Sequence, residues 1–221
     1  MTLNETYQEV VAITQKLIEL GLSIQQNFPH REGNSISCKA GVDISPVLRN
    51  IKYHEKYELL NKEENYNIKL LDGALIQIMY SFNSTGRSLM THRLAYYPAP
   101  HLENYEDNPE SYEGEYFGSS EFHDLLENNV IKTPFRFDYN SDATLFKEVD
   151  HPYAHFHLGE YEGCRIPVHS PLTPALFINF ILRNFYNTAL VAYCDNFSFP
   201  LTTSFSSTIV GSENSVIHLK F

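Results

Sequence analysis

The sequence predicts an α+β fold in a single domain, residues 1–221, with a mostly antiparallel sheet packed against an N-terminal helix and a buried C-terminal helix. Two turn signals between apolar runs in residues 65–100 predict the sheet. Apolar side chains at helical spacing in residues 5–27 and in residues 174–186 predict the two helices. No internal repeat or linker divides the chain, so we expect one domain.

The N-terminal third contains one clear helical pattern, followed by an ambiguous stretch. Residues 5–27 carry apolar side chains at intervals close to 3.6, which predicts an amphipathic helix that Gly21 interrupts or bends. Residues 30–65 are ambiguous. A short helix is expected after Pro46, with Ser45 as its N-cap, because proline suits the first helical turn. The charged stretch KYHEKYE that follows is expected on a solvated face.

Residues 65–100 form the clearest β region. Asp72-Gly73 lies between two apolar runs and is a strong hairpin signal. Ser84-Thr85-Gly86 offers a second turn, so three antiparallel strands are expected. We expect the last of them, which carries His92 and Arg93, to be an ordinary edge strand rather than part of a site.

The second half of the chain adds further elements. The acidic residues 101–118 predict an exposed loop, and residues 119–129 a short helix. Near the C-terminus, Thr173 and Pro174 provide an N-cap and a first turn for the buried helix. Residues 207–221 are expected to form a closing hairpin.

Composition narrows the classes of function. The formal net charge of −11 argues against a protein that coats nucleic acid, which needs clustered lysine and arginine, but it allows one local basic pocket or docking on a basic partner. The three cysteines are far apart and favour a reducing compartment over a disulfide framework. No signal peptide and no apolar run long enough for a bilayer is present. We therefore expect a cytoplasmic protein that does not contact the membrane.

Two segments concentrate chemically active side chains. In KTPFRFDYN the aromatic residues alternate with Arg136 and Asp138, and in YAHFHLG the apolar residues alternate with His155 and His157. Side chains alternate across a strand, so each segment has one apolar and one polar face. If the two strands pair antiparallel with both apolar faces on the core, the arginine, the aspartate and both histidines gather on one surface.

Further candidates lie close by in the sequence. The segment CRIPVH also alternates, so a third short strand would bring Arg165 alongside the first four residues. His151 and His169 are candidate binding residues, and Glu160 and Glu162 are additional acidic groups in the same stretch.

Two chemistries fit this set of residues. Without any cofactor, one histidine removes a proton, the other protonates a leaving group, and Arg136 or Arg165 stabilises the developing negative charge. Alternatively, His155 and His157 bind a divalent metal together with Asp138, since two imidazoles of an HxH strand point the same way. Half-exposed histidines beside a surface ion pair would give the same pattern with no chemistry at all.

The segment from FRFDYN to the end of FINFILRNFY resembles a bacterial family of domains of unknown function. The shared pattern is R-x-D, then H-P-x-x-H-x-H-x-G, then R-x-P and a P-x-x-F helix, and the matching residues are Arg136, Asp138, His151, His155, His157, Gly159 and Arg165. The shorter pattern R-x-D…H-x-H is similar to TumE-like toxins of toxin–antitoxin systems. These resemblances imply a bacterial cytosolic protein from a toxin–antitoxin or phage-defence setting.

The leading hypothesis is an RNase-type toxin or defence effector acting on RNA or another phosphate-containing substrate. Arg136 would hold the phosphate, Asp138 would orient a histidine, His155 and His157 would exchange protons, and Arg165 would assist. One alternative, which the acidic charge favours, is a non-catalytic sensor, scaffold or partner subunit of a defence or toxin–antitoxin complex. Another is a metal-dependent enzyme acting on a small molecule. A protein partner is expected in the first two cases.

Overall fold

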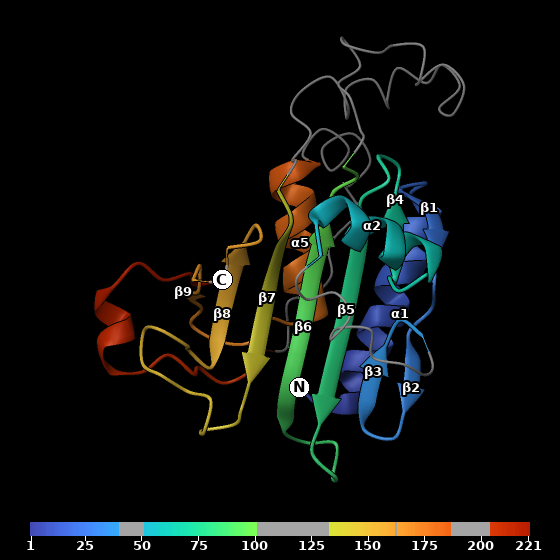
Figure 1. Ribbon diagram of the computed structural model, residues 1–221. Coiled ribbons are helices and arrows are strands. Elements are labelled where there is room, and N and C mark those ends of the chain that lie inside the picture. The colour runs from blue at the N-terminus through green and yellow to red at the C-terminus, as the bar shows by residue number, and fades with distance from the viewer. Residues whose placement is uncertain (40–50, 101–132, 162, 187–203) are drawn as a thin grey trace.

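The structure is a computed structural model that describes residues 1–39, 51–100, 133–161, 163–186 and 204–221. Its α+β fold, with terminal helices on an antiparallel sheet, is the one predicted (Figure 1). The strands are β1 (Ser23–Gln26), β2 (His30–Glu32), β3 (Ser35–Ser37), β4 (Ile68–Leu70), β5 (Leu75–Phe82), β6 (Leu89–Tyr97), β7 (Phe135–Asn140), β8 (Ala154–Leu158) and β9 (Ile166–Pro167). The helices are α1 (Leu3–Glu19), α2 (Tyr53–Lys62), α5 (Pro174–Phe185) and the 3₁₀ helix η1 (Gly211–Ser215).

The sheet runs in the order β1-β4-β5-β6-β7-β8-β9, and β3 also pairs with β5 and carries β2 at its other edge. The pairings between these named strands are antiparallel. Helices α1 and α5 lie behind the sheet in Figure 1, and α2 lies in front of it. The main apolar core fills the layer between the sheet and the two rear helices. The front face of β6 to β9 is therefore left for other groups.

Helix α1 begins with a capping box in which Thr2 and Glu5 bond each other's main chain. It ends at Glu19, and Gly21 follows with φ of +67°, a conformation that glycine adopts without steric cost. The predicted extension to residue 27 is wrong, because the chain turns at Gly21 into β1. The apolar spacing runs through this turn and so conceals it.

Helix α2 packs on the front of the sheet through a small cluster that includes Tyr57, Leu60 and Tyr97. The expected cap Ser45 and Pro46 lie outside the described residues. The expectation that the charged side chains of this stretch are all solvated is wrong for Lys56, which is 8% exposed and forms an ion pair with Glu160 in the turn after β8. This pair ties α2 to the strand that carries both histidines.

The three predicted strands of residues 65–100 are confirmed as β4, β5 and β6. Gly73 and Gly86 have φ of +79° and +68° in the two turns, as the turn signals require. The prediction of an edge strand for β6 is wrong, because β6 is bonded to β5 on one side and to β7 on the other. Its front face is thus adjacent to that of β7.

The C-terminal helix α5 is confirmed, with the Thr173 hydroxyl accepting a hydrogen bond from the Leu176 amide (3.2 Å). The predicted closing hairpin is wrong. Its residues form η1 and then reach Leu219, which makes a parallel bridge with Val168 beside β9. The predicted loop 101–118 and helix 119–129 lie outside the described residues. Among the residues that are described, no helix combines the length and apolarity needed to cross a membrane.

Candidate functional site

The register of three adjacent strands gathers the charged groups of the front face. Arg93 on β6 pairs with Asp138 on β7, and Asp138 pairs with His155 on β8. Two residues further along the same pair of strands, Arg136 lies opposite His157. The antiparallel pairing expected from the alternation of β7 and β8 is therefore present. Phe137 and Phe156 pair on the opposite face and belong to the core.

Asp138 is the anchor of the cluster. Its Oδ2 accepts a hydrogen bond from Arg136 Nε (2.7 Å), and its Oδ1 accepts one from Arg93 Nε (3.3 Å). Burial is the largest single influence and would raise the pKa of this carboxyl, but the positive charges around it, first those of Arg93 and Arg136, together lower the pKa to about 2. Asp138 is therefore a carboxylate at any physiological pH.

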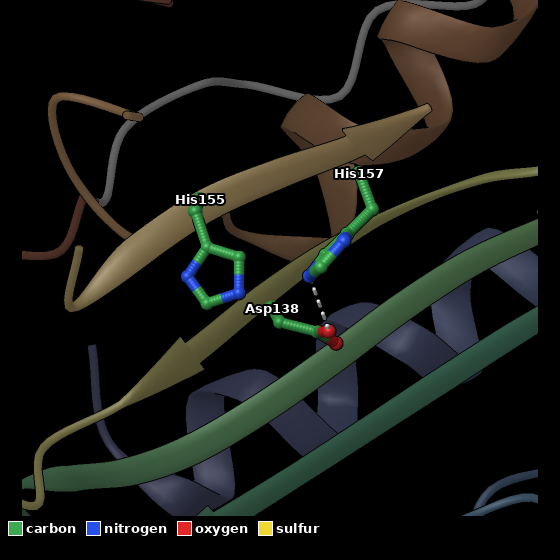
Figure 2. Close-up of side chains that lie close together, drawn as sticks. All are labelled: Asp138, His155 and His157. Atoms are coloured by element: carbon green, nitrogen blue, oxygen red, sulfur yellow. Dashed lines mark ion pairs between the residues drawn. The ribbon is translucent and has the colours of Figure 1, made fainter. Parts of the chain in front are cut away.

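His157 lies against this carboxylate. Its Nε2 is 3.6 Å from Asp138 Oδ2, as the dashed line in Figure 2 shows, and the residue is buried. Burial is the first cause that lowers the pKa of His157, the charge of Arg136 is the second, and together they bring it to about 3. The resting imidazole is thus neutral at pH 7.

His155 is held in one tautomer by the main chain. Its Nδ1 is 2.8 Å from the carbonyl oxygen of Pro152. A carbonyl only accepts hydrogen bonds, so Nδ1 carries the proton and Nε2 keeps a lone pair. Burial lowers the pKa of His155 as well. In Figure 2 the ring lies beside Asp138 and His157, so the basic nitrogen faces the cluster.

A cavity of about 490 Å³ opens over these groups. Among the described residues, three guanidinium groups line it, those of Arg93, Arg136 and Arg165, against one carboxylate, that of Asp138. Arg165 Nε is buried and has no hydrogen-bond partner among the described residues. The cavity is therefore locally positive in a chain of net charge −11, which suits an anionic ligand.

Comparison with protein families adds one match, which covers residues 22–221 and so every described strand and α5. The matching family is described as an uncharacterized conserved protein, DUF2290. The chain belongs to the DUF2290 family. Neither the curated proteins nor the solved structures contain a match to it. The resemblance to a family of unknown function is thereby supported, and the family description carries no activity to transfer.

Most of the predicted site residues of this DUF2290 protein line the cavity described above: Arg136, Asp138, His151, His155, His157 and Arg165. The His151 ring is 5.1 Å from that of His155, and the rings of His155 and His157 are 4.8 Å apart. The three imidazoles thus form a row along β8 and the turn that precedes it.

His169 is the predicted binding residue that the structure does not bring to the cavity. Its main-chain amide donates to Leu219 and its carbonyl accepts from Thr208, so this part of the chain is occupied by the C-terminal tail. Glu160 is engaged by Lys56, and Glu162 lies outside the described residues. Of the cysteines, Cys38 is buried, with a pKa that burial raises to about 11, whereas Cys164 is partly exposed.

Arg93 is the residue that sequence reasoning missed in the DUF2290 cluster. Strand β6 places it directly opposite Asp138. Thr91 and Arg93 alternate with the buried residues His92 and Leu94. To find Arg93 from this alternation, it must also be known that β6 pairs with β7. His92 points to the other face, where its Nε2 accepts a hydrogen bond from the Leu172 amide, and burial lowers its pKa to about 4.

Two kinds of chemistry are open to the DUF2290 cluster. One donor atom each from Asp138, His155 and His157 lies within 4.8 Å of the others, close enough to hold a metal ion. The same groups, with the guanidinium groups around them, are also the parts of a proton-transfer site acting on a bound anion.

Proposed function

We propose that this protein cleaves RNA by transferring protons between His155 and His157, with the arginines of the cavity holding the phosphate. The observation that carries the proposal is the lone pair of His155 Nε2, which the bond to Pro152 leaves free and which faces Asp138 and His157 in a cavity that arginines line. A neutral imidazole beside an anion-binding surface is the arrangement that general-base attack on a phosphodiester needs.

The arginines supply the phosphate-binding part of the proposal. Among the described residues the buried Nε of Arg165 on the cavity has no hydrogen-bond partner, and Arg136 uses its Nε for Asp138, so its terminal nitrogens can donate to a phosphate. Arg93 Nε donates to Asp138 as well. Asp138 fixes both of these side chains at once. Its role here is to position Arg93, Arg136 and His157 rather than to react.

The chemical step uses only groups of the protein and the substrate. His155 Nε2 takes the proton of the ribose 2′-hydroxyl, and the freed oxygen attacks the adjacent phosphorus. The bond from phosphorus to the 5′-oxygen breaks, and that oxygen takes a proton from His157. The products are a 2′,3′-cyclic phosphate and a 5′-hydroxyl end. His157 must be protonated for this, and a phosphate bound at Arg136 brings the negative charge that favours its protonation.

The test is cleavage of a fluorescent RNA oligonucleotide by the purified protein in the presence of EDTA. We expect products that end in a 2′,3′-cyclic phosphate, and a loss of rate of at least about 100-fold in His155→Ala and in His157→Ala. An oligonucleotide of the same sequence with 2′-deoxyribose should stay intact, because it lacks the attacking hydroxyl. His218→Ala is the matched control, since His218 is a half-buried histidine of the tail that does not line the cavity.

Unchanged cleavage in the two cavity variants, or a total absence of cleavage, would remove the proposal and favour a non-catalytic partner subunit. The cellular setting belongs to the same proposal: a bacterial toxin or defence effector restrained by a protein partner. Expression without that partner should arrest growth, and His155→Ala should abolish the arrest.

A metal-dependent hydrolase acting on a small molecule is the second candidate, favoured by the three converging donors of Asp138, His155 and His157. Two guanidinium groups already bond the carboxylate, and a divalent cation placed there would meet their positive charge, which is why this function ranks second. Elemental analysis of protein purified without chelator separates the two. A stoichiometric metal that disappears in the double histidine variant would promote the metal enzyme.

A further inference from the structure

The cavity extends beyond the histidines and arginines onto the strands at its other side. There it is lined by Ser35, Ser37, Met79, Ser81 and Thr91, from β3, β5 and β6. None of these side chains is charged. They occupy alternate positions of their strands, on the same face as Arg93. The cavity therefore has a charged end and an uncharged, hydroxyl-rich end.

The two ends are separated by more than the size of one phosphate group. In the lower part of the sheet in Figure 1, the strands follow one another in the order β3, β5, β6, β7 and β8. Adjacent strands lie about 4.8 Å apart, so β3 and β8 are separated by roughly 19 Å. A ligand whose phosphate sits at the histidines must present uncharged polar groups toward Ser81 and Ser35. The hydroxyls of these two serines lie 3.3 Å apart and can both donate and accept.

We propose that the cavity binds a single-stranded segment of RNA, with the scissile phosphate at the arginines and the adjacent unpaired bases over the uncharged wall. This inference rests on the proposed function and specifies its substrate. Bases and ribose oxygens match serine and threonine hydroxyls, Met79 offers an apolar contact, and the neighbouring phosphates face water. A cavity of about 490 Å³ has the dimensions of a small-ligand pocket and does not admit a double helix.

Binding is tested with a fluorescent 2′-O-methyl hexanucleotide, which the protein cannot cleave through a 2′-hydroxyl. Fluorescence anisotropy should give a dissociation constant at least about tenfold lower for the single strand than for the same strand annealed to its complement. Ser81→Glu and Thr91→Glu place a carboxylate on the uncharged wall, and each should weaken single-strand binding about tenfold. Ser84→Glu, in the exposed turn between β5 and β6, is the control.

The outcomes separate this inference from the proposed activity. Equal affinity for single strand and duplex would overturn the inference, even if RNA cleavage depends on the histidines. The same holds if the glutamate variants have the melting temperature of the unmodified protein and bind the single strand as tightly. Conversely, single-strand binding that both variants weaken, with no RNA cleaved, would sustain the binding site and overturn the activity. Thr91 is exposed, so Thr91→Glu remains informative if Ser81→Glu fails to fold.

Discussion

Asp138 shows how much one side chain organises in this molecule. It is 17% exposed, whereas the guanidinium-bearing side chains of Arg93 and Arg136 that it holds are 34% and 36% exposed. Exposed arginines are held weakly by single ion pairs, because water screens the attraction. A shared, more buried carboxylate gives both of them a fixed position. The benefit for binding an anion is that these donors are oriented before the ligand arrives.

Glu9 gives a residue-scale prediction outside the site. One of its carboxylate oxygens is buried without a hydrogen-bond partner among the described residues, and burial raises the pKa of Glu9 to about 7. The unfolded chain releases this proton near pH 4.5, so the folded protein loses stability as the pH rises from about 4.5 to about 7. Glu9→Gln should remove this loss and so raise the free energy of unfolding at pH 8 by about 1–2 kcal/mol. The gain stays this small because the side chain is only partly buried.

Urea denaturation of both proteins at pH 4.5 and pH 8 measures the effect. The difference in unfolding free energy between variant and unmodified protein should be larger at pH 8. A difference that is the same at the two pH values would show that Glu9 titrates normally. Glu19→Gln, at an exposed position of the same helix, is the control.

At the scale of the elements, the turn from Lys147 to His151 carries backbone strain. Lys147 and His151 bond each other's main chain, and between them Val149 has φ of +70°, which is unfavourable for a β-branched residue. The buried side chain of Glu213 in η1 accepts a hydrogen bond from the Val149 amide (3.3 Å). The C-terminal tail thus fixes the turn that brings His151 to the cavity.

Val149→Gly should relieve this strain. Glycine adopts a positive φ without the steric cost of a side chain, whereas its greater freedom in the unfolded chain offsets part of the gain. We expect a net stabilisation of about 0.5–1 kcal/mol, measured as a higher midpoint of thermal unfolding. Val149→Ala keeps a Cβ and should give a clearly smaller gain. Destabilisation by glycine would mean that the valine side chain contributes more by packing than its backbone costs.

At this scale, the features that could be predicted from the sequence are those whose pattern lies within a single strand or helix. The alternation in β7 and β8 is complete within each strand, so the common face of Asp138 and His155 could be predicted from it. The central place of β6 could not, because its partner β7 lies more than thirty residues further along the chain. The failure at His169 has a similar origin, since the tail that occupies its main chain comes from residues 204–221.

At the scale of the whole molecule, the charge of the cavity opposes the charge of the protein. A net charge of −11 repels nucleic acid at long range, and the three arginines of the cavity attract it only at close range. Binding that rests on so few cations releases few counterions.

The affinity for single-stranded RNA should therefore depend only weakly on salt. For three phosphate contacts, the logarithm of the association constant should fall against the logarithm of salt concentration with a slope of about −2. Anisotropy titrations at salt concentrations from about 50 to about 300 mM measure this slope. A slope several times steeper would indicate a larger basic surface than the described residues provide, and the cavity could not then be the main site of contact.

Strands β7 and β8 serve two purposes at once, since their rear side chains fill the core while their front side chains form the cluster. Inserting or deleting a single residue in either strand would exchange these two sets of side chains, burying charges and exposing aromatic rings. Such an indel would cost the protein its folding and its chemistry together. The two strands are therefore expected to tolerate substitutions better than insertions or deletions.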